Sequence, residues 1–449
     1  MSIAKQCVEM TDLHRTQHGN SPHSAPTFTA SVGRDSNPLY DTMQPKPRVL
    51  FVDQTGQLGG AELCLYDLVA RRDGDDRVVL FQDGPFRELL AEGGVATEVL
   101  PISSRAATLR KDSGVAQKLS AVRGMASLIR RVASRAREFD AIYANTPKAF
   151  IVSAIAGKIA RRPTIYHLHD ILSTDHFSGS NLRLLTTFAN RLSKHVIANS
   201  EATAAAFADA GGDSRKVTIV HNGFDITQFE VGDSQARDAS AKLVASLNNE
   251  NEINDNSSLP ITGDTPLVAV FGRLSPWKGQ HIAIEAIAKT PTAHLLLVGD
   301  AMFGESEYVE QLHVAAERPE TKGRVHFLGF RDEIATLMRA VDIVVHCSTA
   351  PEPFGRVVVE GLLSKTPVIA ANAGGAAEIV RHEQTGLLTT PGDSEALARS
   401  ITRLLSDPEL ARSFADAGYQ DAAKRFRIED RLRETDLVIE NTARRLSVA

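Results

Sequence analysis

The sequence predicts an α/β protein built from two Rossmann-like, doubly wound domains that face each other across a cleft. The chain has 449 residues, which is too long for one ordinary hydrophobic core. Apolar, strand-like runs alternate with helical stretches, a pattern typical of parallel sheets covered on both faces. The alternation occurs twice, before and after a polar segment at about 230–264. The two halves therefore repeat an architecture.

We assign residues 47–222 to the first domain and expect a disordered tail at 1–46, because that polar segment has too few apolar residues to bury. A buried-type strand at 47–53 precedes Gly59 and Gly60 and then a helix, the opening of a nucleotide-binding α/β unit. The GxGxxG motif of nicotinamide-binding proteins is missing here. Further strands are expected at 95–100, 140–144, 164–167, 195–198 and 217–220.

We assign residues 223–427 to the second domain, with a flexible insertion at about 230–264 that is rich in Asn and Glu. A helix at 428–449 closes the chain and carries enough apolar side chains to dock one face. The strands of the second domain are expected at 267–271, 294–298, 324–328, 342–346, 367–370 and 387–389.

Composition excludes several classes of protein. The net charge of −5 argues against a nucleic-acid partner. Three cysteines cannot form a disulfide framework, and their scatter lacks metal-ligand spacing, which indicates a reduced, cytoplasmic compartment. The N-terminus has no apolar signal-peptide core, and no run approaches the roughly 20 apolar residues of a membrane span.

One predicted helix, at 118–137, is basic and contains no acid. Its apolar side chains, Val122, Met125, Ile129 and Val132, form one stripe, and most of its arginines lie opposite. Two interpretations stay open. The helix packs on the sheet with a solvated basic face, or it contacts an anionic membrane surface or a lipid acceptor. The second would place the protein at the inner face of the cell membrane.

The stretch around which the chain is organised begins at Glu352 and ends at Glu360. It reads as a loop that follows a buried strand, then a helix that starts after Phe354 and Gly355. Backbone N–H groups at such a helix start favour anions, and the two carboxylates suit hydroxyl groups or a cation. We interpret the stretch as a site for a phosphorylated sugar.

Two cations, Arg273 and Lys278, follow a strand that ends at Gly272. Ligands bind at the carboxyl ends of the strands in such sheets, and an Arg fork with a compact Lys charge suits a diphosphate. Neither this loop nor the Glu352 loop supplies the Asp-x-Asp carboxylates that would hold a metal under a diphosphate. His167 and His169 share one side of another strand end. No third metal ligand at recognisable spacing is evident, which favours a polar contact from His169 to substrate.

Together these motifs resemble the retaining glycosyltransferases of family 4. The resemblance rests on Arg273 with Lys278, the Glu352–Glu360 motif in its Glu-Pro-Phe-Gly setting, and the Gly-Gly-Ala-Glu run at 59–62. His-Asp at 169–170, Ala-Asn-Ser at 198–200 and His-Asn-Gly at 221–223 add to it. It covers the chain from about residue 47 and implies the GT-B fold, with a last helix that crosses back to the first domain.

The resemblance also implies roles. Arg273 and Lys278 would bind the donor diphosphate, and Glu360 the ribose. Glu352 would accept hydrogen bonds from the transferred sugar, assisted by the amides of Phe354 and Gly355. Gly59 and Gly60 would let the backbone approach the donor, His169 would contact the donor sugar, and the base would stack near Phe330. In three places the chain departs from the family pattern. The loop after Gly299 lacks a second glycine, Asn145 stands where a histidine is common, and the tail and the 230–264 insertion have no counterpart.

We therefore expect a metal-independent, retaining hexosyltransferase without a cofactor, which uses a nucleotide-diphosphate sugar, with UDP favoured over GDP. The acceptor would be a saccharide or a lipid-linked saccharide in exopolysaccharide or cell-envelope synthesis. The alternatives are a nucleotide-sugar epimerase of the same fold and a non-catalytic subunit that binds nucleotide sugar.

Overall fold

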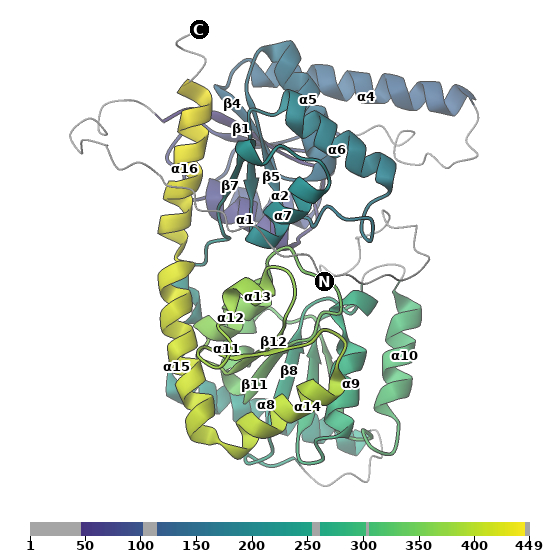
Figure 1. The fold of residues 1–449 in the computed structure, drawn as a ribbon, viewed down its shortest axis with the longest axis vertical. Helices are drawn as coiled ribbons and strands as arrows, with labels where there is room; N and C mark the ends of the chain where they lie inside the picture. Colours follow the sequence, from purple (N-terminus) through teal and green to yellow (C-terminus); the bar gives the residue numbers. More distant parts are fainter. Residues whose placement is uncertain (1–45, 102–114, 254–260, 302–304, 445–449) are drawn as a thin grey trace, which may run out of the picture.

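The computed structural model describes residues 46–101, 115–253, 261–301 and 305–444. Two parallel sheets form two domains stacked along the long axis of the molecule, with helices around each sheet (Figure 1). This confirms the predicted fold class. The segment predicted to be a disordered tail lies outside the described residues, apart from Lys46.

The first domain holds a seven-stranded sheet in the order β3-β2-β1-β4-β5-β6-β7, every neighbouring pair parallel. Its strands are β1 (Val49–Asp53), β2 (Arg77–Leu80), β3 (Thr97–Val99), β4 (Ala141–Ala144), β5 (Thr164–Leu168), β6 (His195–Ala198) and β7 (Val217–Ile219). Its helices are α1 (Gly60–Val69), α2 (Pro85–Glu92), α4 (Val115–Ala136), α5 (Pro147–Ala160), α6 (Gly179–Leu192) and α7 (Glu201–Asp209).

The second domain holds a six-stranded parallel sheet in the order β10-β9-β8-β11-β12-β13. Its strands are β8 (Leu267–Phe271), β9 (His294–Val298), β10 (Val325–Gly329), β11 (Ile343–His346), β12 (Val368–Ala371) and β13 (Leu387–Thr389). Its helices are α8 (Asp233–Ile253), α9 (Gln280–Ala288), α10 (Ser306–Ala316), α11 (Ile334–Ala340), α12 (Arg356–Leu363), α13 (Ala376–Ile379), α14 (Ser394–Ser406) and α15 (Pro408–Arg425).

Both sheets reverse their strand order at one point, between β1 and β4 and between β8 and β11. Chain connections leave such a point in opposite directions, so the loops that follow the two strands diverge and leave room for a ligand. The loops after β1, β8 and β11 carry most of the predicted site residues. The topology therefore places them where ligands bind in sheets of this kind.

The strands are buried along their full length in the middle of each sheet, because helices cover both faces. One face of the first sheet packs against α4 and α5 in a core that includes Val132 and Val152, and the other packs against α1, α2 and the last helix, α16 (Ile428–Arg444). Ile439 of α16 is fully buried there. The chain therefore returns to the first domain at its end (Figure 1).

The two chain crossings between the domains lie side by side. Phe224 donates its N–H to the carbonyl of Phe426 (2.8 Å), and Ile428 donates to the carbonyl of Phe224 (3.0 Å). A Cβ on Gly223 would lie 2.9 Å from the Cα of Ile428, so this position has no room for a side chain. The paired crossings connect the two domains.

The expected flexible insertion at about 230–264 is wrong for most of its length, because Asp233–Ile253 forms helix α8. Leu243 and Leu247, one helical turn apart, are buried in the core of the second domain and dock α8 beside α11. Residues 254–260 lie outside the described part.

Helix α4, the predicted basic helix, packs through its C-terminal half and extends past the domain at its other end (Figure 1). Two of its arginines serve the fold: Arg135 binds both carboxylate oxygens of Glu98 (2.8 and 2.9 Å), and Arg131 donates to the carbonyl of Pro101. Val122, which belongs to the apolar stripe, is 65% exposed. Among the described residues no helix is both long and apolar enough to cross a bilayer.

Candidate functional site

The loops at the carboxyl ends of both sheets meet at the boundary between the domains. Helix α7 of the first domain contacts the Glu-Pro-Phe-Gly loop of the second, because the Thr203 hydroxyl donates to the carbonyl of Pro353 (3.2 Å). Gly60, at the start of α1, faces Arg356, at the start of α12: a Cβ on Gly60 would lie 3.5 Å from the Arg356 Cδ. The predicted site residues of the two domains are thus brought to one boundary.

Lys278 and Glu352 form a close ion pair at the centre of the second domain's edge. The Lys278 ammonium donates to Oε1 of Glu352 (2.6 Å), and the Ser348 hydroxyl donates to the same oxygen (2.5 Å). Nε2 of His346, at the end of β11, lies 2.9 Å from it. Burial by itself would raise the pKa of Glu352, but Lys278 and His346 outweigh it and hold that pKa well below its usual range. Glu352 is therefore an ionised, buried carboxylate.

Two glycines allow this pairing. Gly279 follows Lys278 with a φ of 76°, and a Cβ there would lie 2.0 Å from the carbonyl oxygen of Cys347, so only glycine lets the loop after β8 press against the end of β11. Gly374, with a φ of 59°, allows the loop after β12 to pass as closely beside the backbone of Glu352. The Gly375 N–H then donates to the Glu352 carbonyl (2.8 Å) and fixes the loop.

Helix α12 begins at Arg356 after Gly355, whose φ is 98°, and carries Glu360 one turn later. Nε of Arg356 lies 3.5 Å from Oε1 of Glu360, and its guanidinium lies over the ring of Phe224 (4.6 Å). Burial raises the pKa of Glu360, and Arg356 opposes that effect. Nη1 of Arg356 is buried and has no hydrogen-bond partner among the described residues, so this donor is available to a ligand.

His169 is positioned by a series of hydrogen bonds that runs through Asn145 to Asp53. Its Nε2 lies 3.0 Å from Oδ1 of Asn145, and the Asn145 amide donates to Asp53 (2.7 Å) and to the carbonyl of Ala61 (3.0 Å). Burial, with the charge of Arg356, lowers the pKa of His169 to about 3, so the imidazole is neutral. Asn145, at the position where a histidine is common, thus fixes the orientation of His169.

Two further carboxyl groups lie beside this chain. Burial and the charge of Asp53 raise the pKa of Glu62, in the first turn of α1, to about 8. Burial raises the pKa of Asp170, the residue after His169, to about 6. The first domain therefore brings acids with raised pKa values, which are partly protonated near neutral pH, to the same boundary.

A carboxylate of the second domain fastens the two domains together. Glu378, in α13, accepts hydrogen bonds from the first two amides of α7, Glu201 (2.9 Å) and Ala202 (2.7 Å). These amides have no partner within their own helix, and the helix dipole favours a negative charge there. Nε2 of His221 lies 3.7 Å from the same carboxylate.

The remaining predicted residues follow strands or begin a helix. Gly272 directly follows β8, and Nε of Arg273, which is partly exposed, lies 3.7 Å from Glu305. Phe330 follows β10 and is 63% exposed, so its ring is available for stacking. Gly59 is the N-cap of α1, and a Cβ on it would meet the carboxylate of Glu62.

Sequence reasoning missed several residues of this boundary. The predicted Glu352–Glu360 motif is flanked by His346 and Ser348 and contains Arg356. Their closeness to the motif in the sequence was the one signal that could have identified them as site residues. Cys64 was set aside because it has no partner at short spacing, yet it lies beside His167 and His169 in the structure.

Comparison with known proteins agrees with this geometry. Residues 251–421 match the family model described as glycosyl transferases group 1, and residues 58–228 match the model described as glycosyltransferase family 4. The chain belongs to glycosyltransferase family 4, with the GT-B fold, and it is a glycosyltransferase.

Among solved structures, HepE from Anabaena in complex with UDP is 41% identical, with a TM-score of 0.76; the match covers 88% of this chain and all of that one. The same protein was solved with UDP-glucose. Among curated proteins, the lipopolysaccharide core biosynthesis glycosyltransferase LpsE of Rhizobium meliloti is 34% identical over 38% of this chain and 49% of its own length. The D-inositol 3-phosphate glycosyltransferase of Mycobacterium tuberculosis is 32% identical over 43% and 37%. The chain spans less than half the length of these two relatives.

Proposed function

We propose that this protein is a retaining, metal-independent hexosyltransferase that moves a sugar from a UDP-sugar to a saccharide acceptor. The observation that carries the proposal is the buried Lys278–Glu352 pair at the switch point of the second sheet, facing the boundary with the first domain. It combines a fixed cation for a leaving diphosphate with a carboxylate for sugar hydroxyls. The UDP and UDP-glucose complexes of HepE support UDP as the donor nucleotide.

In this proposal the chain's own side chains offset the charge that develops on the diphosphate as the glycosidic bond breaks. Lys278, fixed by Glu352, and Arg273 meet that charge, and the unpartnered Nη1 of Arg356 supplies a further donor. Glu360 takes the ribose hydroxyls, and the exposed ring of Phe330 stacks on the base. No metal ion or cofactor takes part.

His169 contacts the donor sugar near the reacting carbon, while Gly59 and Gly60 let the start of α1 approach the donor. In a front-face reaction, the bond from the anomeric carbon to the diphosphate breaks as the acceptor oxygen bonds to the same face. The acceptor proton passes to the leaving phosphate oxygen. A neutral His169 can accept a hydrogen bond from a sugar hydroxyl without adding charge to the transition state.

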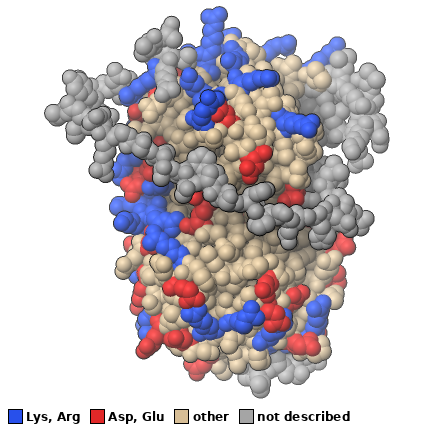
Figure 2. Space-filling view, in the orientation of Figure 1, with Lys and Arg blue, Asp and Glu red and all other residues tan. Residues whose placement is uncertain are grey.

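For the acceptor we propose a lipid-linked saccharide of the cell envelope or of an exopolysaccharide, reached from the cytoplasmic face of the membrane. Helix α4 supports this, because its projecting part carries exposed Val122 and Arg123 on neighbouring positions. Lysines and arginines outnumber acids along the top of the first domain in Figure 2. The similarity to LpsE, a lipopolysaccharide core biosynthesis glycosyltransferase, also supports a cell-envelope acceptor.

The test is transfer from UDP-glucose, other UDP-hexoses and GDP-mannose to lipid-linked saccharides, with the anomeric configuration of the product read by NMR. We expect a UDP-sugar donor and a retained configuration. Lys278→Met should abolish transfer, while Lys322→Met, the same change at an exposed ion pair, should leave it intact. An inverted product, equal activity of both variants, or a changed nucleotide sugar formed without acceptor would contradict the proposal; the last result would indicate an epimerase.

A further inference from the structure

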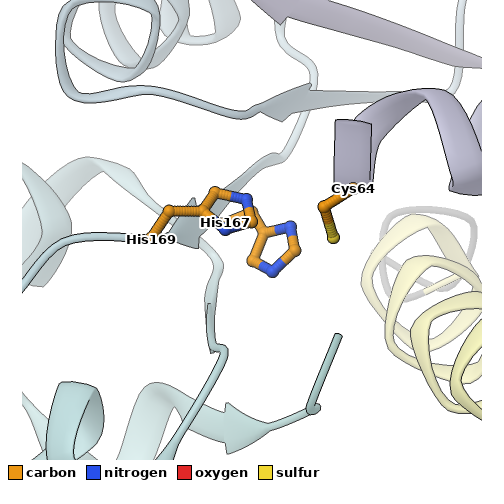
Figure 3. Close-up of side chains that lie close together, drawn as sticks. All are labelled: Cys64, His167 and His169. Atoms are coloured by element: carbon orange, nitrogen blue, oxygen red, sulfur yellow. The ribbon is translucent and has the colours of Figure 1, made fainter. Parts of the chain in front are cut away.

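Three potential metal ligands converge beside His169. Cys64 comes from α1, His167 from the end of β5, and His169 from the loop after it. One ligand atom from each lies within 4.8 Å of the other two. Figure 3 shows the sulfur of Cys64 beside the two imidazoles, whose ring centroids are 3.8 Å apart.

The two histidines are oriented as metal ligands usually are. Nδ1 of His167 lies 2.6 Å from the Tyr143 hydroxyl, and Nε2 of His169 lies 3.0 Å from the Asn145 carbonyl oxygen. When each ring directs its N–H to that oxygen, the lone pair remains on the other nitrogen, as in metal sites whose histidines are held by a supporting oxygen.

The second observation is an unsatisfied atom. Nε2 of His167 is buried and has no hydrogen-bond partner among the described residues, although His167 is only 5% exposed. A buried nitrogen without a partner is costly and uncommon in native proteins. A metal ion bound to this nitrogen would satisfy it.

The types of the three ligands fit a metal of intermediate softness, because such metals bind imidazole nitrogen and thiolate sulfur. The Cys64 thiol donates to Oδ1 of Asn222 (3.4 Å). A bound ion would take the place of that hydrogen bond.

We propose that Cys64, His167 and His169 form a site for a thiophilic divalent cation, with Zn²⁺ as the best fit, and that the bound ion inhibits sugar transfer. Two imidazoles, one thiolate and an open fourth position form a common zinc ligand set. Zinc bonds of about 2.0–2.3 Å place such ligands roughly 3.3–3.8 Å apart, so small side-chain rotations close the cluster. The inhibition, which rests on the proposed function, follows because the ion withdraws His169 from the donor sugar.

The site is tested in the full chain by Co²⁺, whose bond to a thiolate gives a near-ultraviolet charge-transfer band. The parent for this test carries Cys7→Ser and Cys347→Ser, which leaves Cys64 as the remaining thiol of the three in the sequence. We expect one Co²⁺ per chain, the thiolate band, and displacement by Zn²⁺.

Adding Cys64→Ser should abolish the band and weaken binding by more than the roughly 10–100-fold that loss of a supporting group causes. His167→Gln should also weaken binding. His326→Gln, the same change at another buried histidine beside a second imidazole, should not. A parent without the band, or a band that survives Cys64→Ser, would overturn the site.

The inhibition has its own readout. Zn²⁺ should slow transfer by the parent and be reversed by a chelator, while the Cys64→Ser variant keeps its basal rate and resists Zn²⁺. Equal inhibition of both would overturn the inhibitory role and leave the cobalt result standing. If no sugar donor is turned over, the proposed function fails, and the cobalt titration still decides the site.

Discussion

The Lys278–Glu352 pair gives the sharpest stability prediction. The side chains are 19% and 7% exposed, so Lys278→Met leaves a carboxylate buried without its cation. Removing one partner of a buried ion pair typically costs about 3–5 kcal/mol. We expect the lower end of that range, because the Ser348 hydroxyl and Nε2 of His346 still lie within 3 Å of Oε1 of Glu352.

The same prediction has a pH signature. The folded-state pKa of Glu352 lies below its unfolded value, so its stabilisation is present above about pH 4.5 and is lost as the pH falls through the folded pKa. In Lys278→Met, protonation of Glu352 relieves the cost of burial instead. The difference in unfolding free energy between parent and variant should therefore be largest near pH 7 and shrink below pH 4.5.

The assay is urea unfolding followed by tryptophan fluorescence. Trp277, the only tryptophan of the chain, precedes Lys278, whose ammonium lies 4.5 Å from the centre of the Trp277 ring, so the signal reports the second domain. Lys322→Met is the control. Adding Glu352→Gln to Lys278→Met should recover part of the loss, because no charge then stays buried. If Lys278→Met unfolds within about 0.5 kcal/mol of the control, or if the second change recovers nothing, the pair is not a buried ion pair.

Three further outcomes are expected. Glu378→Ala should raise hydrogen exchange of the first two amides of α7 about tenfold or more, since it removes charge-assisted hydrogen bonds; unchanged exchange would refute the contact. Gly223→Ala should lower the free energy of unfolding by about 1–3 kcal/mol, because the added Cβ would clash with the backbone of Ile428. The control Gly232→Ala has open space around the added Cβ and should not lower it. Equal urea midpoints for the two variants would contradict this prediction. Burial raises the pKa of Glu62 in the folded protein to about 8, against its ordinary value of 4.5. Its stabilisation is therefore full below pH 4.5 and is lost as the pH rises through 8. Glu62→Gln should flatten that decline, which can reach the order of 5 kcal/mol, in chemical unfolding at pH 5–9; parallel curves would contradict it.

The strands were predictable because their apolar runs are long and are bounded by glycines and polar loops, as at 267–271 before Gly272. Helix α8 was not, because its composition is polar and few apolar side chains dock it, chiefly Leu243, Val244 and Leu247. Three such side chains are a weak periodic signal in a segment of that length. The prediction of a flexible segment gave more weight to the asparagines and acids near its end than to these apolar side chains.

The site was partly predictable for a topological reason. Residues at the carboxyl ends of strands gather at one edge whatever their separation, so Lys278 and Glu352 could be assigned to the same edge of one sheet. The sequence could not show that Lys278 and Ser348 both donate to the same carboxylate oxygen of Glu352. That contact depends on how closely Gly279 and Gly374 let the loops approach each other. Cys64 in helix α1 and His167 in strand β5 pose the same problem, because their closeness depends on how the helix packs on the sheet.

The contacts across the boundary belong to the same loops that carry the site. Arg356 lies close to Gly60 at the start of α1 and, after burial, its charge is the second cause that lowers the pKa of His169. A change in the distance between the domains would alter both interactions together. Because Glu378 binds α7 across the same boundary, the contact between the domains and the environment of His169 are physically coupled. Loosening that contact should raise the pKa of His169 toward its usual value.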